Sequence, residues 1–323
     1  MGTTFGSASA VSSALTYELG VYAKILFLFN FASTNGTKDM HSSGNKSMRI
    51  EIEEVIAAKS PKLKKYTPSF LINLVKKTIH QDEINEVLSN YGHLQGVELA
   101  SAALDHLGIT YTVHGIEQID RGRRYIIASN HPLGGLDGMI IIKLFGTLFK
   151  NVKFVVNDLL YFVEPFKPIF LPVNKYGKQS QSSVKMIDES YSSNDQILYF
   201  PAGLCSRLIR GKVTDIEWRK SYITQAIKYN RDILPLFFDG KNSKFFYRFA
   251  RLRSALRIKF SLETALLPHE MFKKRGSHFD IYIGEPISCE DLKSCKSVAE
   301  WNKIVREQVY KLKERYGTGN KAN

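Results

Sequence analysis

The sequence is poor in cysteine and has no long apolar run. Its three cysteines, Cys205, Cys289 and Cys295, have neither the even number of a secreted disulfide framework nor the paired spacing of a zinc site. No uninterrupted apolar stretch approaches the roughly 18 to 20 residues that cross a bilayer. No Lys or Arg precedes Lys24, so the charged start of a secretory signal is also missing. We therefore expect a protein of a reducing, cytosolic compartment without a membrane-spanning helix.

Acidic residues are scarce relative to basic ones. The chain has 31 Asp and Glu against 45 Lys and Arg, which gives a formal net charge of +14. Such a surplus favours an anionic partner: lipid headgroups, an acidic carrier protein or nucleic acid. Because no zinc finger or aromatic-rich RNA-binding strand accompanies the charge, we expect no nucleic-acid partner. Basic clusters at residues 62–77 and 248–257 favour an anionic membrane surface, although 62–77 fits an ordinary core-packed helix equally well.

Composition and periodicity divide the chain into three regions. Residues 1–46 are rich in Ser, Thr, Gly and Asn, and are either a disordered tail or an extension upstream of a start at Met48. Residues 47–107 have the apolar spacing of helices. Residues 108–323 alternate short apolar runs with helical patterns, which predicts an α/β domain with a mixed central sheet flanked by helices. The expected strands are residues 111–113, 125–128, 152–156, 169–173, 197–200, 233–238 and 279–283.

The clearest chemical signal is a glycine-rich turn that follows the apolar run 125–128 and contains His131 and Asp137. Acyl transfer from a thioester to an alcohol needs a base, a group that orients the base, and donors for the oxyanion. His131 can be the base, because a neutral imidazole with a pKa of about 6.5 accepts a proton near neutrality. Asp137 can orient it. Alternatively, Asn130 and His131 cap the turn and Asp137 caps the next helix.

The segment Asn-His-Pro-Leu-Gly-Gly-Leu-Asp, residues 130–137, resembles the first motif of the glycerol-3-phosphate and lysophosphatidate acyltransferase superfamily. That motif normally has a shorter His-to-Asp spacing, whereas five residues separate His131 from Asp137 here. This spacing is similar to that of the branch with haemolysin-like and amino-acid-lipid acyltransferases. Gly134 and Gly135 are expected to absorb the additional residue and to let the backbone approach the substrate.

A second segment, residues 200–207, follows an expected strand and resembles the superfamily's Phe-Pro-Glu-Gly-Thr-Arg-Ser motif. The Glu and Arg positions of that motif hold Ala202 and Cys205. A tight turn at Pro201 and Gly203 is the simpler interpretation. A helix carrying Asp215, Trp218 and Lys220 is expected just beyond, with Trp218 in the core. The expected substrate-binding residues of this part are Phe200, Pro201, Gly203, Ser206, Arg207 and Arg210.

The place where the superfamily has an acceptor-binding Arg holds Asn174 and Lys175 here, so these two are expected to contact the acceptor. Asn130, Gly134 and Gly135 complete the expected substrate-binding set. A terminal phosphate is normally held by Arg. Because the expected guanidinium is missing, the resemblance favours a monoacylated amino-acid lipid as acceptor, with lysophosphatidate as the main alternative.

Together these features predict a bacterial O-acyltransferase that acts on a lyso-lipid, with His131 as general base and Asp137 as its orienting group. The donor is expected to be acyl carrier protein or acyl-CoA, without a cofactor or metal. The expected location is cytoplasmic, peripheral on the inner face of the cell membrane. The alternative is a non-catalytic membrane- or nucleic-acid-binding module of the same fold. An ester hydrolase is disfavoured, since no Gly-x-Ser-x-Gly nucleophile elbow is present.

Overall fold

The computed structural model describes residues 49–54, 67–157, 163–173, 180–257, 262–294 and 296–319. These residues contain a seven-stranded sheet with the strand order β1-β9-β8-β2-β5-β3-β4. All neighbouring strands run parallel except β8 and β9, which pair antiparallel. The strands are β1 (Thr110–His114), β2 (Tyr125–Ser129), β3 (Val152–Asn157), β4 (Phe170–Val173), β5 (Gln196–Tyr199), β8 (Asp232–Asp239) and β9 (His278–Ile283).

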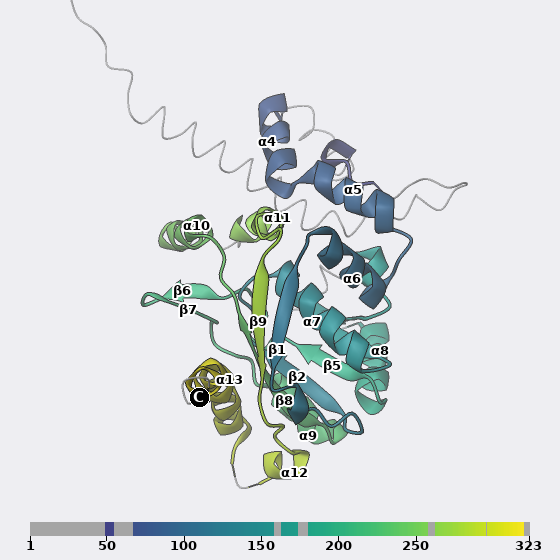
Figure 1. The fold of residues 1–323 in the computed structure, drawn as a ribbon, viewed down its shortest axis with the longest axis vertical. Coiled ribbons are helices and arrows are strands. Elements are labelled where there is room, and N and C mark those ends of the chain that lie inside the picture. The colour runs from purple at the N-terminus through teal and green to yellow at the C-terminus, as the bar shows by residue number, and fades with distance from the viewer. Residues whose placement is uncertain are drawn as a thin grey trace, which may run out of the picture.

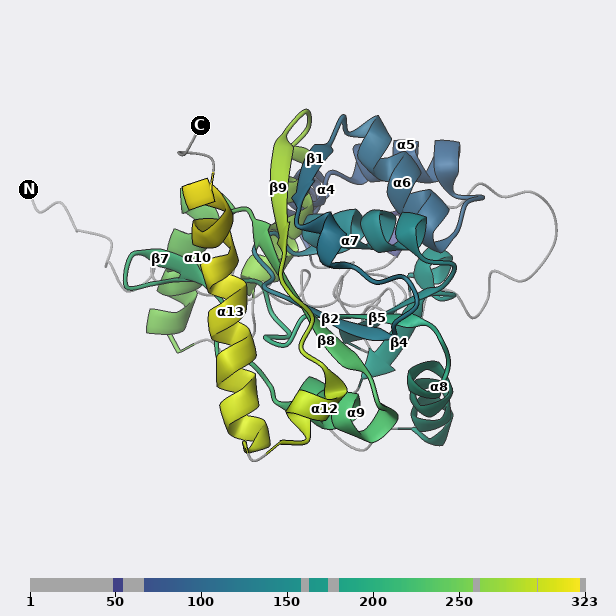
Figure 2. The same cartoon turned by 60° about the horizontal axis from the view of Figure 1, so that its bottom comes forward.

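Helices cover both faces of this sheet. Helices α6 (Gly96–His106) and α7 (Gly135–Leu148) pack on one face, whereas α9 (Ser221–Tyr229) and α13 (Val298–Gly319) contact β8 from the other. Figures 1 and 2 show α7 and α13 on opposite sides of the sheet. The predicted mixed α/β architecture is therefore confirmed, with a strand at each expected position.

Strand β2 lies in the middle of the sheet and is buried along its whole length. Tyr125 and Ile127 point into the core under α7, whereas Ile126 and Ala128 point into the core formed with α9 and α13. Because successive side chains of a strand alternate between faces, a continuous apolar run suits a strand that is covered on both sides. The turn that follows β2 is thus attached to the most deeply buried part of the fold.

The N-terminal helical region contains α4 (Ser69–Ile79) and α5 (Gln81–Tyr91) in addition to α6. In α4, Leu71 and Val75 are buried, whereas Phe70 and Leu74 are 58% and 48% exposed. Of the basic segment 62–77, residues 62–66 lie outside the described residues, as do residues 1–46. The remaining helices are α8 (Gln181–Ser192), α10 (Lys244–Ala255), α11 (Leu267–Phe272), α12 (Cys289–Leu292) and the short 3-10 segments η1 (Ile116–Gln118), η3 (Glu164–Phe166) and η4 (Leu262–Leu266).

The expectations were wrong in one part of the chain, residues 207–220. The short strands β6 (Arg207–Ile209) and β7 (Lys212–Thr214) form an antiparallel hairpin that the sequence pattern did not indicate. The helix expected to carry Asp215, Trp218 and Lys220 is absent there, because α9 begins only at Ser221. Trp218 is a core residue as expected, with 2% of its surface exposed.

Candidate active site

The turn after β2 begins with Asn130, whose side chain links two neighbouring strands. Its amide nitrogen donates to the carbonyl oxygen of Phe238 at 3.0 Å, and its amide oxygen accepts from the Phe238 N–H at 2.7 Å. Phe238 lies in β8, the parallel neighbour of β2. Asn130 is 3% exposed, so the structure uses its amide to fix the position from which His131 leaves the sheet.

His131 and Asp137 are in contact despite the five residues between them. The Nδ1 atom of His131 lies 3.1 Å from Oδ2 of Asp137. Asp137 is fully buried, and it also accepts the N–H groups of Leu133 and Gly138, each at 2.8 Å. The carboxylate therefore has a fixed position and accepts the Nδ1–H proton. This tautomer leaves the lone pair on Nε2, which has no hydrogen-bond partner among the described residues.

The His131 ring is also held from its face. The Phe200 ring stacks on it at a centroid distance of 3.9 Å and an interplanar angle of 19°. Phe154 packs against Phe200 edge to face at 5.3 Å. A methyl group at Gly138 would lie 3.2 Å from Phe154, so the glycine lets the aromatic pair approach α7 closely. His131 retains an exposed fraction of 17% in its side chain, which leaves the imidazole accessible.

Gly134 has a backbone conformation that only glycine adopts readily. Its φ is 84° and its ψ is −117°, and it is the N-cap residue of α7. A methyl group there would lie 2.8 Å from Leu267 and 3.0 Å from the sulfur of Cys205. The neighbouring Gly135 is exposed, and nothing lies within 4 Å of the position that an added methyl group at Gly135 would occupy. Gly134 therefore gives the segment between His131 and Asp137 a conformation that a larger residue would strain; its role in absorbing the longer spacing stays a prediction. Helix α7 begins without a side-chain cap, so its first N–H groups face the turn.

The second predicted segment lies beside the first. The N–H of Ser206 donates to the carbonyl oxygen of His131 at 2.7 Å, which ties the two turns together. Pro201 is buried, and its carbonyl oxygen accepts the N–H of Arg219 at 3.0 Å. Gly203 has a φ of 62° and is exposed, as expected for a tight turn. The structure thus brings Phe200 and Ser206 to His131, and uses Pro201 and Gly203 to shape the turn.

Asp215 is a residue of this site that the sequence analysis placed in a helix. Its carboxylate accepts the N–H of His131 at 3.2 Å, the hydroxyl of Ser206 and the indole N–H of Trp218 at 2.8 Å. Asp215 is 1% exposed, and burial raises the pKa of its carboxyl, while these three hydrogen bonds act in the opposite direction. In the sequence, the only local feature that could have pointed to Asp215 as a site residue is its position three residues before Trp218.

The two predicted arginines occupy different surroundings. Arg207 lies 2.6 Å from Glu263, which also contacts Arg253 at 2.8 Å and is fully buried. This pair of arginines joins the site turn to η4 and α10. Arg210 is exposed at the tip of the β6–β7 hairpin with a φ of 48°. Asn174 and Lys175, the other basic or polar candidates for acceptor binding, lie outside the described residues.

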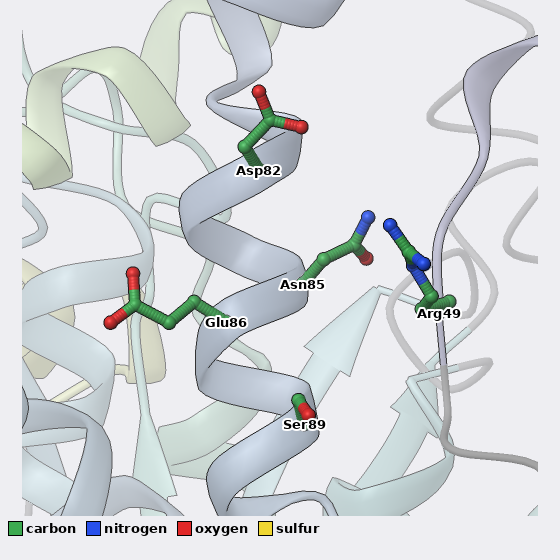
Figure 3. A pocket seen from close by; sticks show the side chains of 5 residues that line it. All are labelled: Arg49, Asp82, Asn85, Glu86 and Ser89. Atoms are coloured by element: carbon green, nitrogen blue, oxygen red, sulfur yellow. The ribbon is translucent and has the colours of Figure 1, made fainter.

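Hollows elsewhere on the molecule do not include the His131 turn. One of about 290 Å³ lies between residue 49 and α5, where Asn85 points toward Arg49 and Glu86 points away from it (Figure 3). Another of about 210 Å³ lies beside α13.

The part of the chain that the structure describes contains no group of three or more His, Cys, Asp or Glu that could hold a metal ion. No helix in the same residues has the length and apolarity needed to cross a bilayer.

Comparison with known proteins gives a consistent picture. The sequence model of the family described as acyltransferase matches residues 54–319. A lyso-glycine lipid O-acyltransferase of Bacteroides thetaiotaomicron is 39% identical over 264 residues, which cover 81% of this chain and 97% of that protein. A protein of the same name from Phocaeicola vulgatus is 38% identical over 264 residues, covering 81% of this chain and 95% of that protein.

Among solved structures, the 1-acyl-sn-glycerophosphate acyltransferase PlsC of Thermotoga maritima matches with a TM-score of 0.42 and 17% sequence identity. The match covers 74% of this chain and 95% of that one. The family match and the two bacterial relatives decide between the alternatives left open by the sequence, in favour of an enzyme over a non-catalytic module.

Proposed function

This chain belongs to the acyltransferase family, and we propose that it transfers a fatty acyl group from a thioester to the hydroxyl of an amino-acid lyso-lipid. The observation that carries the proposal is the contact between His131 and the buried Asp137 at the end of β2. The high coverage of two relatives that are named lyso-glycine lipid O-acyltransferases supports the acceptor class.

In the proposed reaction, Nε2 of His131 removes the proton of the acceptor hydroxyl while its oxygen attacks the thioester carbonyl. Asp137 holds the Nδ1–H and stabilises the imidazolium that forms. The tetrahedral intermediate then collapses, the carbon–sulfur bond breaks, and His131 returns the proton to the departing thiolate. The products are an ester and a free thiol, so no protein nucleophile is required.

The oxyanion of this intermediate requires hydrogen-bond donors. The N–H groups at the start of α7 are suited to this role, because its N-cap residue Gly134 has no side chain to cap them. The N–H of Gly138 does not contribute, since it is bonded to Asp137. Gly134 and Gly135 place no side chain between these groups and the substrate. We assign Gly135 to the approach of the thioester carbonyl, since it is exposed and has open space around it.

The acceptor preference is supported by what replaces the missing Glu and Arg of the second motif. Ala202 and Cys205 are both 4% exposed, and burial raises the pKa of the Cys205 thiol, which keeps it neutral. The nearest arginine in sequence, Arg207, is paired with Glu263. A phosphomonoester is normally held by a bidentate guanidinium, which this place lacks. An acceptor with an amino-acid headgroup does not need that guanidinium.

The proposal also covers the acyl donor and the location of the enzyme in the cell. A fatty acyl thioester of acyl carrier protein or of coenzyme A would serve as donor, and the surplus of basic residues suits either anionic carrier. The chemistry needs no metal or other cofactor. The enzyme would act as a peripheral protein at the inner face of the cell membrane, where lyso-lipids reside; the candidate acceptor contacts include Asn174, Lys175 and Arg210.

The test is acyl transfer from a labelled acyl thioester to a panel of acceptors in detergent micelles. The panel contains lyso-glycine lipid, other amino-acid lyso-lipids and lysophosphatidate. The proposal predicts saturable ester formation with an amino-acid lyso-lipid at a kcat/KM well above that for lysophosphatidate. A preference for lysophosphatidate would reject the acceptor class, and transfer to none of these lipids would reject the proposed function.

A further inference from the structure

Large apolar side chains that are exposed to solvent gather on one side of the molecule. In the described residues ten such side chains are exposed, and seven of them lie on α4, β6 and α10, counting Leu256, the C-cap residue of α10. These elements are neighbours in space, because η4 contacts both α4 and α10, and α10 contacts β6. Figure 1 shows α10 between α4 and the β6–β7 hairpin. The seven residues are Phe70, Leu74, Leu208, Ile209, Phe245, Leu252 and Leu256.

Helix α10 has two apolar sides, of which only one is needed for packing. Phe246 and Tyr247 are buried against Cys205 and Leu266. On the other side Phe245, Leu252 and Leu256 are 61%, 57% and 60% exposed. The latter residues, together with the half-buried Phe249, recur at the three- and four-residue spacing that forms a stripe along a helix. Of these four, Phe249 packs against the buried cluster of Phe246 and Leu266 and stacks on Phe245. Phe245, Leu252 and Leu256 keep more than half of their surface exposed.

The charge on these elements has one sign. The sequence of α10, KFFYRFARLRSA, contains four basic residues and no acidic one. Among them Lys244, Arg248 and Arg251 are exposed beside the apolar stripe. The hairpin RLIRGKVT and helix α4 likewise contain basic residues without an acidic one. An apolar stripe flanked only by cations is the pattern of a helix that lies in the headgroup region of an anionic bilayer.

We infer that α10, flanked by α4 and the β6–β7 hairpin, is the surface by which this protein docks on an anionic lipid bilayer. We refer to these three elements as the basic–apolar face. The inference deepens the proposed function, because a bilayer is the source of a lyso-lipid acceptor. A bilayer fits better than a single protein partner, since the exposed apolar residues occupy three separate elements instead of a groove.

Helix α10 of the basic–apolar face and the turn of the candidate active site adjoin the same buried cluster. Gly134 of the site turn packs near Cys205 and Leu267, and Cys205 belongs to the same buried cluster as Phe246 of α10. Glu263 binds Arg207 beside the turn and Arg253 on α10. A bilayer in contact with the outer side of α10 would therefore be separated from the turn by α10 and the buried cluster beneath it.

The experiment is co-sedimentation of the full chain with vesicles, using phosphatidylglycerol mixed with phosphatidylcholine, or phosphatidylcholine alone. We expect binding to the anionic vesicles, weaker binding to neutral ones, and a decrease with added salt. The double variant Leu252→Glu/Leu256→Glu should need about tenfold more lipid, or more, for half-maximal binding. The matched control is Val184→Glu on α8, which is 52% exposed and lies on another side of the molecule (Figures 1 and 2).

Unchanged binding of the double variant, equal loss in the Val184→Glu control, or no binding of the natural protein would each overturn the inference. So would binding of an acidic acyl carrier protein at α10 in place of vesicles. All substituted residues are exposed, and thermal unfolding checks that each variant is folded. Transfer to a lyso-lipid in detergent micelles is measured in parallel. Vesicle binding without transfer would reject the proposed function alone, and transfer without vesicle binding would reject the docking surface alone.

Discussion

Asp137 and Asp215, which hold the His131 turn, are 0% and 1% exposed, whereas Phe245 and Leu252 on the basic–apolar face are 61% and 57% exposed. In the turn, polar groups are buried and their hydrogen bonds are made within the protein. On the face, large apolar side chains such as Phe245 and Leu252 keep more than half of their surface exposed. Each arrangement is costly unless something compensates it. Internal hydrogen bonds compensate in the turn, and a bilayer would compensate on the face.

The largest expected effect outside His131 itself is that of Asp137→Asn, which should reduce acyl transfer without reducing vesicle binding. Asp137→Asn places an amide where the carboxylate accepts the N–H of Leu133 and the Nδ1–H of His131. Both of these bonds end on Oδ2, while Oδ1 accepts the N–H of Gly138. An amide has a single accepting oxygen, so its NH2 group must face either the Gly138 N–H or the His131 ring, and the His131 tautomer is no longer fixed. We expect kcat to fall by about a hundredfold, and by no more than in His131→Ala, because Asp137 acts only through His131, while anionic vesicle binding stays unchanged. A rate near that of the natural protein would show that Asp137 does not orient the base.

A smaller effect is expected from Gly134→Ala, measured as the free energy of unfolding in urea. The backbone strain alone should cost about 1 to 3 kcal/mol, and the added methyl group would press on Leu267 and Cys205. Gly135→Ala is the control, because no atom lies within 4 Å of its added methyl group. Equal stability of the two variants would contradict the conformation described for the turn.

Asp215→Ala tests whether the buried acid supports the turn. It leaves three donors without their acceptor: the N–H of His131, the Ser206 hydroxyl and the Trp218 indole. We expect a loss of about 1 to 3 kcal/mol in unfolding free energy and a reduced kcat, since His131 is less well fixed. Glu217→Ala, an exposed acid two residues further on, serves as control and should change neither quantity. No change in Asp215→Ala would remove this residue from the site.

The smallest expected effect concerns pH and the attachment of α4. Nε2 of His80, at the end of α4, lies 2.9 Å from Nδ1 of His269 in α11. Burial, followed by the nearby His80 charge, lowers the pKa of His269. The folded state therefore takes up this proton less readily than the unfolded chain, so stability is lost as pH falls below about 6.5. We expect the Tm to drop on acidification, and less so in His269→Gln. Equal slopes for both proteins would contradict this account.

Most strands of the sheet could be predicted because they are short apolar runs that are buried almost throughout, as in β2 and β8, or on one face, as in β3 and β9. The β6–β7 hairpin was missed because its strands have only three residues each and expose Leu208 and Ile209. Such a segment has no buried face whose periodicity could indicate a strand. Asp215 was assigned to a helix because its partners, which hold it in a loop, could not be inferred locally.

Sequence distance likewise limited the prediction of the site. The His131–Asp137 contact joins residues six apart, and a single turn brings them together. The contact of His131 with Asp215 spans 84 residues, and that of Arg207 with Glu263 spans 56. Only the fold brings such residues together. For this reason Arg207 was expected to bind the acceptor, whereas the structure shows its pairing with Glu263; its role toward substrate stays a prediction.

The most direct test of the central claim compares the natural protein with His131→Ala at equal folded concentration. Acyl transfer to a lyso-glycine lipid and binding to anionic vesicles are measured on the same samples. If His131 is the general base, transfer falls by about a hundredfold or more, and vesicle binding is unchanged. Equal transfer by both proteins would contradict the assignment of His131 and with it the proposed mechanism.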